Sequence, residues 1–104
     1  MTLQVRFDPA AVGEARAARD WYNDASPGLG ADFIDELWRT IEQVRRWPAL
    51  APRLALEGVS DEMRRAPLRG FPFGVIYVVF GDVLWVVAVA HAWRRPGYWR
   101  SRTR

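Results

Sequence analysis

The sequence predicts an α+β fold in which a small antiparallel β-sheet, with an N-terminal strand, carries an α-helical hairpin on one face. Two apolar runs, residues 71–80 and 83–90, flank only Gly81-Asp82, which is typical of a β-hairpin with a type II′ turn. Two stretches with apolar residues at helical spacing precede this hairpin, and a short alternating stretch precedes them. This grouping of strands and helices favours an α+β domain.

The β-hairpin is predicted to lie in the middle of the sheet, because apolar residues occupy both of its faces. Strict alternation along its second strand places Val83, Trp85, Val87 and Val89 on one face and Leu84, Val86 and Ala88 on the other. Another part of the chain must cover one face. We expect another molecule to cover part of the second face.

The N-terminal part of the chain predicts a strand followed by two helices. Residues 3–7 alternate between apolar and polar side chains, as in a half-buried strand. Asp8-Pro9 has the pattern of an N-cap followed by Pro, which predicts a helix over about residues 9–24. A second helix is predicted over about residues 27–47 and ends at Trp47-Pro48. The helical hairpin is expected to pack on the sheet through Ala15, Tyr22, Phe33, Leu37 and Ile41.

The remaining segments predict a loop, an edge strand and a basic tail. Pro and Gly interrupt any periodicity from residue 48 to residue 61, which indicates a loop. Residues 62–68 resemble a strand, and Pro67 places it at an edge or a bulge because proline cannot donate to a β-ladder. The tail at about 92–104 combines five Arg with three aromatic residues and no acid.

Length and composition indicate one domain over residues 1–104, with 50% hydrophobic residues to form a core. No apolar run approaches the ~18 residues of a membrane span, and no signal sequence is evident, so we expect a cytoplasmic protein without membrane partners. The chain has no Cys and one His, so no metal site is expected. We expect no cofactor and no small-molecule substrate.

Charge is distributed unevenly along the chain. Residues 1–62 contain seven Arg and eleven acidic residues, whereas residues 63–104 contain eight Arg and only Asp82 as an acid. This split indicates an anionic partner for the C-terminal half. Every basic residue is Arg, which can clamp a carboxylate or phosphate but is a poor general base.

The order of elements, together with particular residues, resembles the RelE/ParE family of bacterial toxins. The residues that carry this resemblance are Trp21-Tyr22, Gly28-Leu29-Gly30, Phe33, Arg65, Leu68, Phe71-Pro72-Phe73, Tyr77, His91, Arg94, Arg95-Pro96, Tyr98-Trp99 and Arg102. The resemblance spans nearly the whole chain. It implies the toxin of a type II toxin–antitoxin module, as used in plasmid stabilisation, which inhibits growth and is neutralised in a hetero-oligomer with a cognate antitoxin.

The family includes two activities, and the resemblance favours the ParE-like one. ParE-like members poison DNA gyrase by binding, whereas RelE-like members cut messenger RNA in the ribosome with basic residues of the sheet. This chain has Gly74 and Pro67 near the positions where the nucleases carry basic groups, and it has no Lys. We therefore expect gyrase to be the target and catalysis to be absent. Ribosome-dependent RNA cleavage is the alternative, and in that case Arg65, Glu62 and His91 are the catalytic candidates.

The expected contacts with a target or antitoxin come from Arg65, Arg69, Tyr77, Arg94, Arg95, Tyr98, Trp99 and Arg102. For some of these positions a structural role is the stronger expectation: His91 as a hydrogen-bonded strand end, and Tyr98 and Trp99 packed back onto the sheet. Arg65 needs a carboxylate, supplied either by an antitoxin or by the chain itself, for example by Glu62. A generic basic nucleic-acid-binding domain is a second alternative, although no known recognition motif is present.

Overall fold

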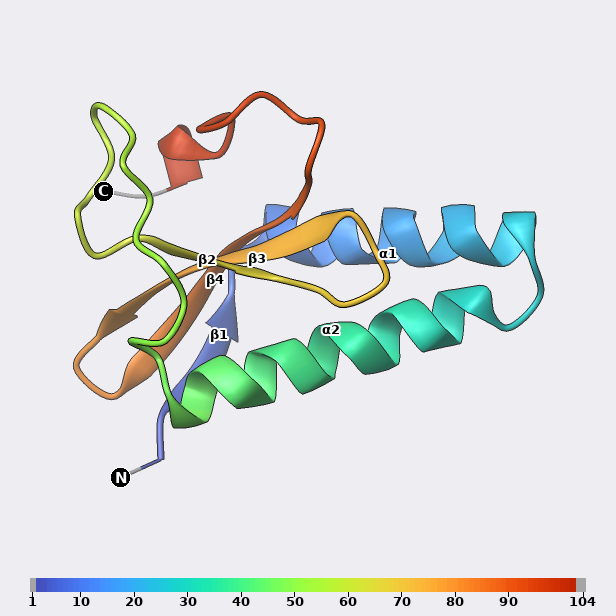
Figure 1. Cartoon of the computed structure of the whole chain (residues 1–104), viewed down its shortest axis with the longest axis horizontal. Helices are drawn as coiled ribbons and strands as arrows, with labels where there is room; N and C mark the ends of the chain where they lie inside the picture. The colour runs from blue at the N-terminus through green and yellow to red at the C-terminus, as the bar shows by residue number, and fades with distance from the viewer. Residues whose placement is uncertain (1, 103–104) are drawn as a thin grey trace.

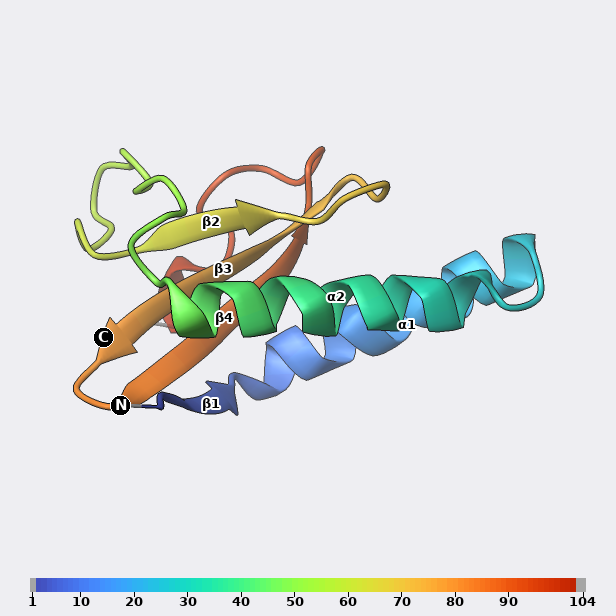
Figure 2. The same ribbon diagram turned by 60° about the horizontal axis from the view of Figure 1, so that its bottom comes forward.

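The computed structural model describes residues 2–102. Four strands form one mixed sheet in the order β1-β4-β3-β2, and two long helices form a hairpin that lies along one face and projects beyond the strands (Figure 1 and Figure 2). The elements are β1 (Gln4–Phe7), α1 (Pro9–Ala25), α2 (Leu29–Arg46), β2 (Arg64–Pro67), β3 (Phe73–Phe80), β4 (Val83–His91) and the short 3-10 helix η1 (Arg100–Arg102). The predicted fold class is confirmed. The predicted basic tail includes residues 103 and 104, which lie outside the described residues.

The strands β2, β3 and β4 form the predicted antiparallel meander, and β1 joins it in parallel beside β4. Gly81 in the turn has φ 58, and no other residue type within 2–102 has positive φ. A type I′ turn would need positive φ at Asp82 too, so the geometry agrees with the predicted type II′ turn. Strand β2 lies at an edge of the sheet, as predicted from Pro67.

The helical hairpin begins and ends close to the predicted residues. The Asp8 side chain accepts a hydrogen bond from the Ala10 N–H and caps α1. The second helix begins at Leu29, two residues after the predicted start, because Gly28 takes a left-handed conformation with φ 89 and forms its N-cap. At Gly30 the helices meet so closely that a Cβ would lie 2.5 Å from the Arg19 carbonyl oxygen.

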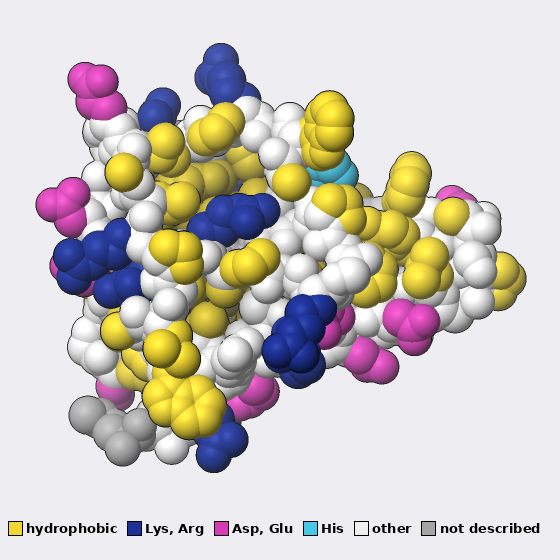
Figure 3. Space-filling view, viewed as in Figure 1, with side chains coloured by type: hydrophobic (Ala, Val, Ile, Leu, Met, Phe, Trp, Pro, Cys, Tyr) yellow, Lys and Arg dark blue, Asp and Glu magenta, His cyan; other side chains and the backbone are white. Residues whose placement is uncertain are grey.

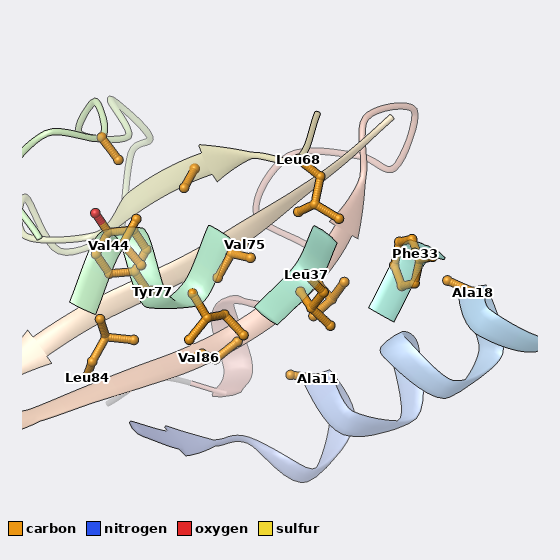
Figure 4. Close-up of a cluster of buried hydrophobic side chains, with 14 residues drawn as sticks. Ala11, Ala18, Phe33, Leu37, Val44, Leu68, Val75, Tyr77, Leu84 and Val86 are labelled. Atoms are coloured by element: carbon orange, nitrogen blue, oxygen red, sulfur yellow. The ribbon is translucent and has the colours of Figure 1, made fainter. Parts of the chain in front are cut away.

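The main core lies between the helices and the sheet (Figure 4). Phe33, Leu37 and Ile41 of α2 are buried there, as predicted, and Ala15 and Tyr22 of α1 are partly buried against them. The strands contribute Val75, Tyr77, Leu84, Val86 and Val89. We call this side of the sheet the helix-covered face.

A β-bulge in β4 changes which side chains reach this core. Ile76 pairs with Ala88 but Tyr77 pairs with Val86, so Val87 is an extra residue. Val87 and Ala88 therefore both pack in the second cluster, and Val89 rejoins Leu84 and Val86 on the helix-covered face. The prediction of strict alternation is wrong beyond Val87, because the bulge reverses the phase of the strand there.

The opposite side of the sheet is covered by irregular segments rather than by helices. The loop between α2 and β2 and the segment after β4 both lie on this side (Figure 1 and Figure 2). Met63, Ile76, Val78 and Trp99 are among its buried side chains. We call this side the loop-covered face. Within residues 2–102, no helix is long and apolar enough to cross a membrane.

Candidate binding surface at the loop-covered face

Arg65 lies on the loop-covered face of the sheet. It projects from β2, where it pairs with Ile76, and its guanidinium lies over Gly74. A Cβ at residue 74 would lie 2.5 Å from the guanidinium carbon, so glycine provides the room for Arg65. Within residues 2–102, Arg65 has no side-chain hydrogen bond and no ion pair. An unpaired arginine in a partly buried position favours an anionic ligand.

Glu62 does not supply the carboxylate that Arg65 needs. Its Oε1 lies 3.8 Å from an Arg53 Nη atom, and both of these side chains are more than half exposed. Glu62 precedes β2 and is not among the residues around Arg65. Of the two alternatives for Arg65, the intramolecular pair with Glu62 is therefore not formed among residues 2–102.

Arg65 opens into a pocket of about 420 Å³, which we call the Arg65 pocket. Its walls combine apolar residues of the loop-covered face with three arginines, Arg65, Arg94 and Arg95, and none of the described acidic residues lines it. Figure 3 shows basic side chains among hydrophobic ones above the sheet. The pocket is thus suited to a carboxylate or phosphate carried by a partly apolar ligand.

The C-terminal segment is fixed to the sheet by a carboxylate from α1. Glu14 Oε1 accepts hydrogen bonds from the Val89 N–H at 3.0 Å and from Arg102 Nη1 at 2.8 Å. Its Oε2 accepts from the Tyr98 hydroxyl at 2.6 Å and from Arg102 Nη2 at 3.0 Å. Arg102 also donates to the Val87 carbonyl at the bulge, at 3.1 Å. We call this set of contacts the Glu14 latch.

Three predicted contact residues, Tyr98, Trp99 and Arg102, belong to the segment that the Glu14 latch holds against the sheet. Trp99 is 2% exposed, and burial together with the hydrogen bond to Glu14 raises the pKa of Tyr98. The prediction that Tyr98 and Trp99 pack back onto the sheet is confirmed. Arg102 is already paired with Glu14, so neither Trp99 nor Arg102 offers a free group to a partner.

Tyr77 and Arg69 are also separate from the Arg65 pocket. Tyr77 is fully buried on the helix-covered face, where its hydroxyl donates to the Pro48 carbonyl at 2.6 Å and burial raises its pKa to about 12. It therefore holds the loop after α2 and is not accessible to a partner. The Arg69 backbone N–H donates to Glu36 Oε2, and its exposed side chain lies at a different hollow beside α2.

His91 ends β4 and lies between two hollows. Its Nδ1 accepts a hydrogen bond from the Trp93 N–H at 3.0 Å, and its ring meets the ring of Phe73 edge-on at 5.0 Å. These contacts agree with the structural role predicted for His91. His91 and Arg65 line the same pocket, whereas Glu62 does not, so the three catalytic candidates are not brought together. Among the described residues, no group of acidic and histidine side chains could hold a metal ion.

The second hollow is a largely apolar groove of about 550 Å³ beside α1, which we call the apolar groove. Ala17, Ala18 and Trp21 of α1 line one side, and Phe73, His91 and Tyr98 are among the residues that line the other. Figure 3 shows hydrophobic side chains beside the histidine and along the projecting end of the helical hairpin. Trp21 is 68% exposed, and Trp93, in the turn after β4, is 89% exposed. Exposed aromatic side chains at a concave site are typical of protein interfaces.

Trp93, Trp21 and Glu14 are the residues that the sequence-based prediction missed. Glu14 follows Ala11 by three residues and precedes Ala18 by four, so it shares a helix face with two buried alanines. An acidic side chain on a buried helix face needs a hydrogen-bond or ion-pair partner. The spacing of Glu14 relative to Ala11 and Ala18 could therefore have identified it from the sequence. The exposure of Trp93 could not have been predicted in this way, because Trp99 is a residue of the same type in the same segment and is buried.

Comparison with solved structures places the fold among known ones. A chain titled "Chromosomal ParDE TA system from P. aeruginosa" superposes with a TM-score of 0.66 at 18% sequence identity, over 86% of this chain and 96% of that chain. At 18% sequence identity this structural similarity establishes the fold alone. No protein-family model and no curated protein matches the sequence.

Proposed function

We propose that this chain is the toxin of a type II toxin–antitoxin module and that it inhibits growth by binding its target rather than by cleaving RNA. The observation that carries the proposal is the likeness to a chain of a ParDE system over nearly the whole length of both chains. DNA gyrase is the proposed target, and the protein acts in the cytoplasm. A cognate antitoxin neutralises it in a hetero-oligomer.

The residues around Arg65 favour binding over catalysis. Arg65 is the one strand arginine in its pocket, Gly74 contributes no side chain, and no lysine exists to act as a base. The removal of one preorganised donor typically lowers a catalytic rate by ~10²–10³, so a site without two such groups retains little catalysis. Binding of an anionic group requires only the charge and shape that are present.

Ribosome-dependent RNA cleavage is the second candidate, and one observation favours it. His91 and Arg65 line the same pocket, so a phosphate held by Arg65 would lie near an imidazole. Against it, Nδ1 of His91 is engaged by the Trp93 N–H and Glu62 lies outside this pocket. We therefore place this activity second.

Target contacts are proposed for the turn that follows β4. Trp93, Arg94 and Arg95 are exposed there, and the turn is held by hydrogen bonds from the Trp93 N–H to Nδ1 and from the Arg94 N–H to the carbonyl of His91. Trp and Arg are among the residue types that dominate binding energy in protein interfaces. Tyr98 also contacts this turn, because the Arg94 guanidinium lies 3.9 Å from the centre of the Tyr98 ring in a cation–π contact.

Two assays on the induced toxin test this function. Messenger RNA ends are mapped on translating ribosomes, and supercoiling by purified gyrase is measured with and without the protein. We expect growth arrest, inhibited supercoiling and no new RNA ends. Codon-phased RNA ends with unaffected supercoiling would overturn the ParE-like assignment and support Arg65 and His91 as catalytic residues. Absence of growth arrest, with no complex formed by the product of the adjoining reading frame, would overturn the toxin assignment itself.

A further inference from the structure

The two edges of the sheet differ in how they are closed. At β2, the Arg65 N–H donates to the Pro52 carbonyl at 3.2 Å, and Arg64 forms a β-bridge with Arg53 in the preceding loop. Pro67 ends this strand and has no N–H to offer. At the other edge, β1 pairs with β4 alone in the part of the chain that the structure describes (Figure 2). The edge at β1 is therefore open to pairing with another strand.

The backbone groups on the open side of β1 belong to Leu3, Val5 and Phe7. The N–H groups of Gln4 and Asp8 donate in the other direction, to the turn before β4 and to β4 itself, at 2.8 and 2.9 Å. Because backbone groups alternate in direction along a strand, those of the odd-numbered residues point away from β4. They form a row of donors and acceptors for a second strand.

The side chains of this segment are complementary to themselves in an antiparallel pairing centred on Val5. In that register Gln4 of one copy lies opposite Arg6 of the other, and Leu3 lies opposite Phe7. Within one chain Arg6 Nη2 already donates to Gln4 Oε1 at 3.3 Å, so the two side chains lie on the same face and can bond to each other. A second copy of the chain therefore meets polar groups with polar groups and apolar groups with apolar groups.

An exposed aromatic side chain lies beside the same strand. Trp38 of α2 is 49% exposed, and its ring meets that of Phe7 edge-on at 5.7 Å. Leu3, Val5 and Phe7 are half-buried against the main core on the helix-covered face. Leu3 of a second copy, placed opposite Phe7, would add apolar cover next to Trp38.

We infer that the chain forms a two-fold symmetric homodimer in which the two β1 strands pair antiparallel and join both sheets into one. Val5 and its symmetry mate exchange both backbone hydrogen bonds, and the Phe7 N–H donates to the Leu3 carbonyl of the other copy. Arg45 Nη1 contacts this carbonyl at 3.5 Å, which leaves a second lone pair free. The interface is isologous and therefore closed, so no third copy adds to it. This inference is independent of the proposed function, since β1 contributes no residue to the apolar groove or the Arg65 pocket.

Sedimentation equilibrium of the full chain alone tests the dimer. A four-residue strand makes a small interface, so we expect a reversible dimer with a Kd in the range of about 1 μM to 1 mM. Val5→Pro removes the outward N–H without breaking a bond to β4 and should weaken dimerisation by about tenfold or more. Val5→Ala, which keeps that N–H, is the matched control and should weaken it by less than about threefold. Circular dichroism confirms that both variants are folded. A chain that stays monomeric, or equal weakening by both substitutions, would overturn the inference.

A crosslink tests the register and direction of the pairing, and it does not depend on whether Val5→Pro folds. The chain has no Cys, so Gln4→Cys and Arg6→Cys each carry a single thiol at an exposed position. Opposed positions of an antiparallel pair lie within the Cα separation that a disulfide spans, about 4.4–6.8 Å, whereas diagonal positions lie about 7–8 Å apart. After mild oxidation by copper phenanthroline, we expect an equal mixture of the two variants to form crosslinked dimers and each variant alone to form far fewer. Crosslinking of each variant with itself, as a parallel pairing would give, or no crosslink in the mixture would overturn the inference.

Discussion

The two faces of the sheet are closed in different ways. On the helix-covered face, Phe33, Ile41 and Tyr77 are fully buried, and the polar groups that reach this core have partners within the chain, as for the Tyr77 hydroxyl. On the loop-covered face, the cover consists of a loop and the C-terminal segment, and Arg65 has no ion-pair partner within residues 2–102. The first face therefore supplies stability, whereas the second combines burial with a charge that is available for binding.

The largest expected effect follows from deletion of a ring on the helix-covered face. Phe33 contacts the rings of Tyr22, Phe71 and Phe73 at centroid distances of 5.5, 5.3 and 5.1 Å. Phe33→Ala should lower the free energy of unfolding by about 3–5 kcal/mol, as measured by urea denaturation. Trp93→Ala, which removes a larger but 89% exposed ring, should change it by less than about 0.5 kcal/mol. Equal losses in the two variants would contradict the division between the faces.

A smaller loss is expected from the Glu14 latch, which holds the C-terminal segment. Glu14→Gln keeps the side-chain shape but leaves Arg102, whose side chain is 17% exposed, without its carboxylate. We expect a loss of about 1.5–3 kcal/mol and faster tryptic cleavage after Arg100 and Arg102. The control Glu42→Gln breaks the more exposed pair with Arg45 and should cost less than about 1 kcal/mol. Unchanged cleavage in Glu14→Gln would show that the Glu14 carboxylate is not what holds the segment.

Acidic pH should lower the free energy of unfolding through protonation of Glu36, which lies on α2. The hydrogen bond from Arg39, assisted by the Arg69 backbone N–H, lowers the pKa of Glu36 from 4.5 to about 2. Because the folded pKa lies below the unfolded one, this contribution is complete above about pH 4.5 and is lost as the pH falls toward about 2. Glu36→Gln should flatten the fall in urea midpoint across that window. Asp35→Asn, at an exposed neighbouring position, is the control, and the same flattening in that variant would exclude Glu36 as the cause.

The smallest effect on stability is expected at the Arg65 pocket. Arg65→Gln should change the free energy of unfolding by less than about 0.5 kcal/mol, since the guanidinium has no ion-pair or hydrogen-bond partner within residues 2–102. Gly74→Ala should also unfold at nearly the wild-type temperature, because the clashing atoms are the mobile end of Arg65. A large loss of stability in Arg65→Gln would show that the charge is structural and would remove the contrast between the faces.

The fold could be predicted from the sequence where local rules agreed. The turn at Gly81, the cap at Asp8 and the edge position of Pro67 each follow from backbone chemistry, and each is confirmed. The bulge at Val87 could not be predicted, because Val87, Ala88 and Val89 are all apolar and any phase of alternation fits them.

The candidate site was predicted less completely than the fold. Arg65, Arg94 and Arg95, three of the predicted contact residues, line one pocket, whereas Tyr77 and Trp99 are buried and Arg102 is paired. A periodic segment constrains its own orientation, whereas an irregular tail is oriented by tertiary contacts such as the Glu14 latch, which joins residues 88 positions apart. Loop-borne residues can therefore be identified as candidates from sequence, but their exposure depends on the fold.

The packing of Arg65 on Gly74 restricts how this sheet can change over evolutionary time. The backbone at residue 74 does not require glycine, since its φ is not positive, so the restriction comes only from the space that the guanidinium occupies. A long basic side chain gained at residue 74 would enter the volume that Arg65 now fills. The two positions should therefore covary, because a basic side chain gained at residue 74 is accommodated only where the side chain of residue 65 is shortened or moves aside.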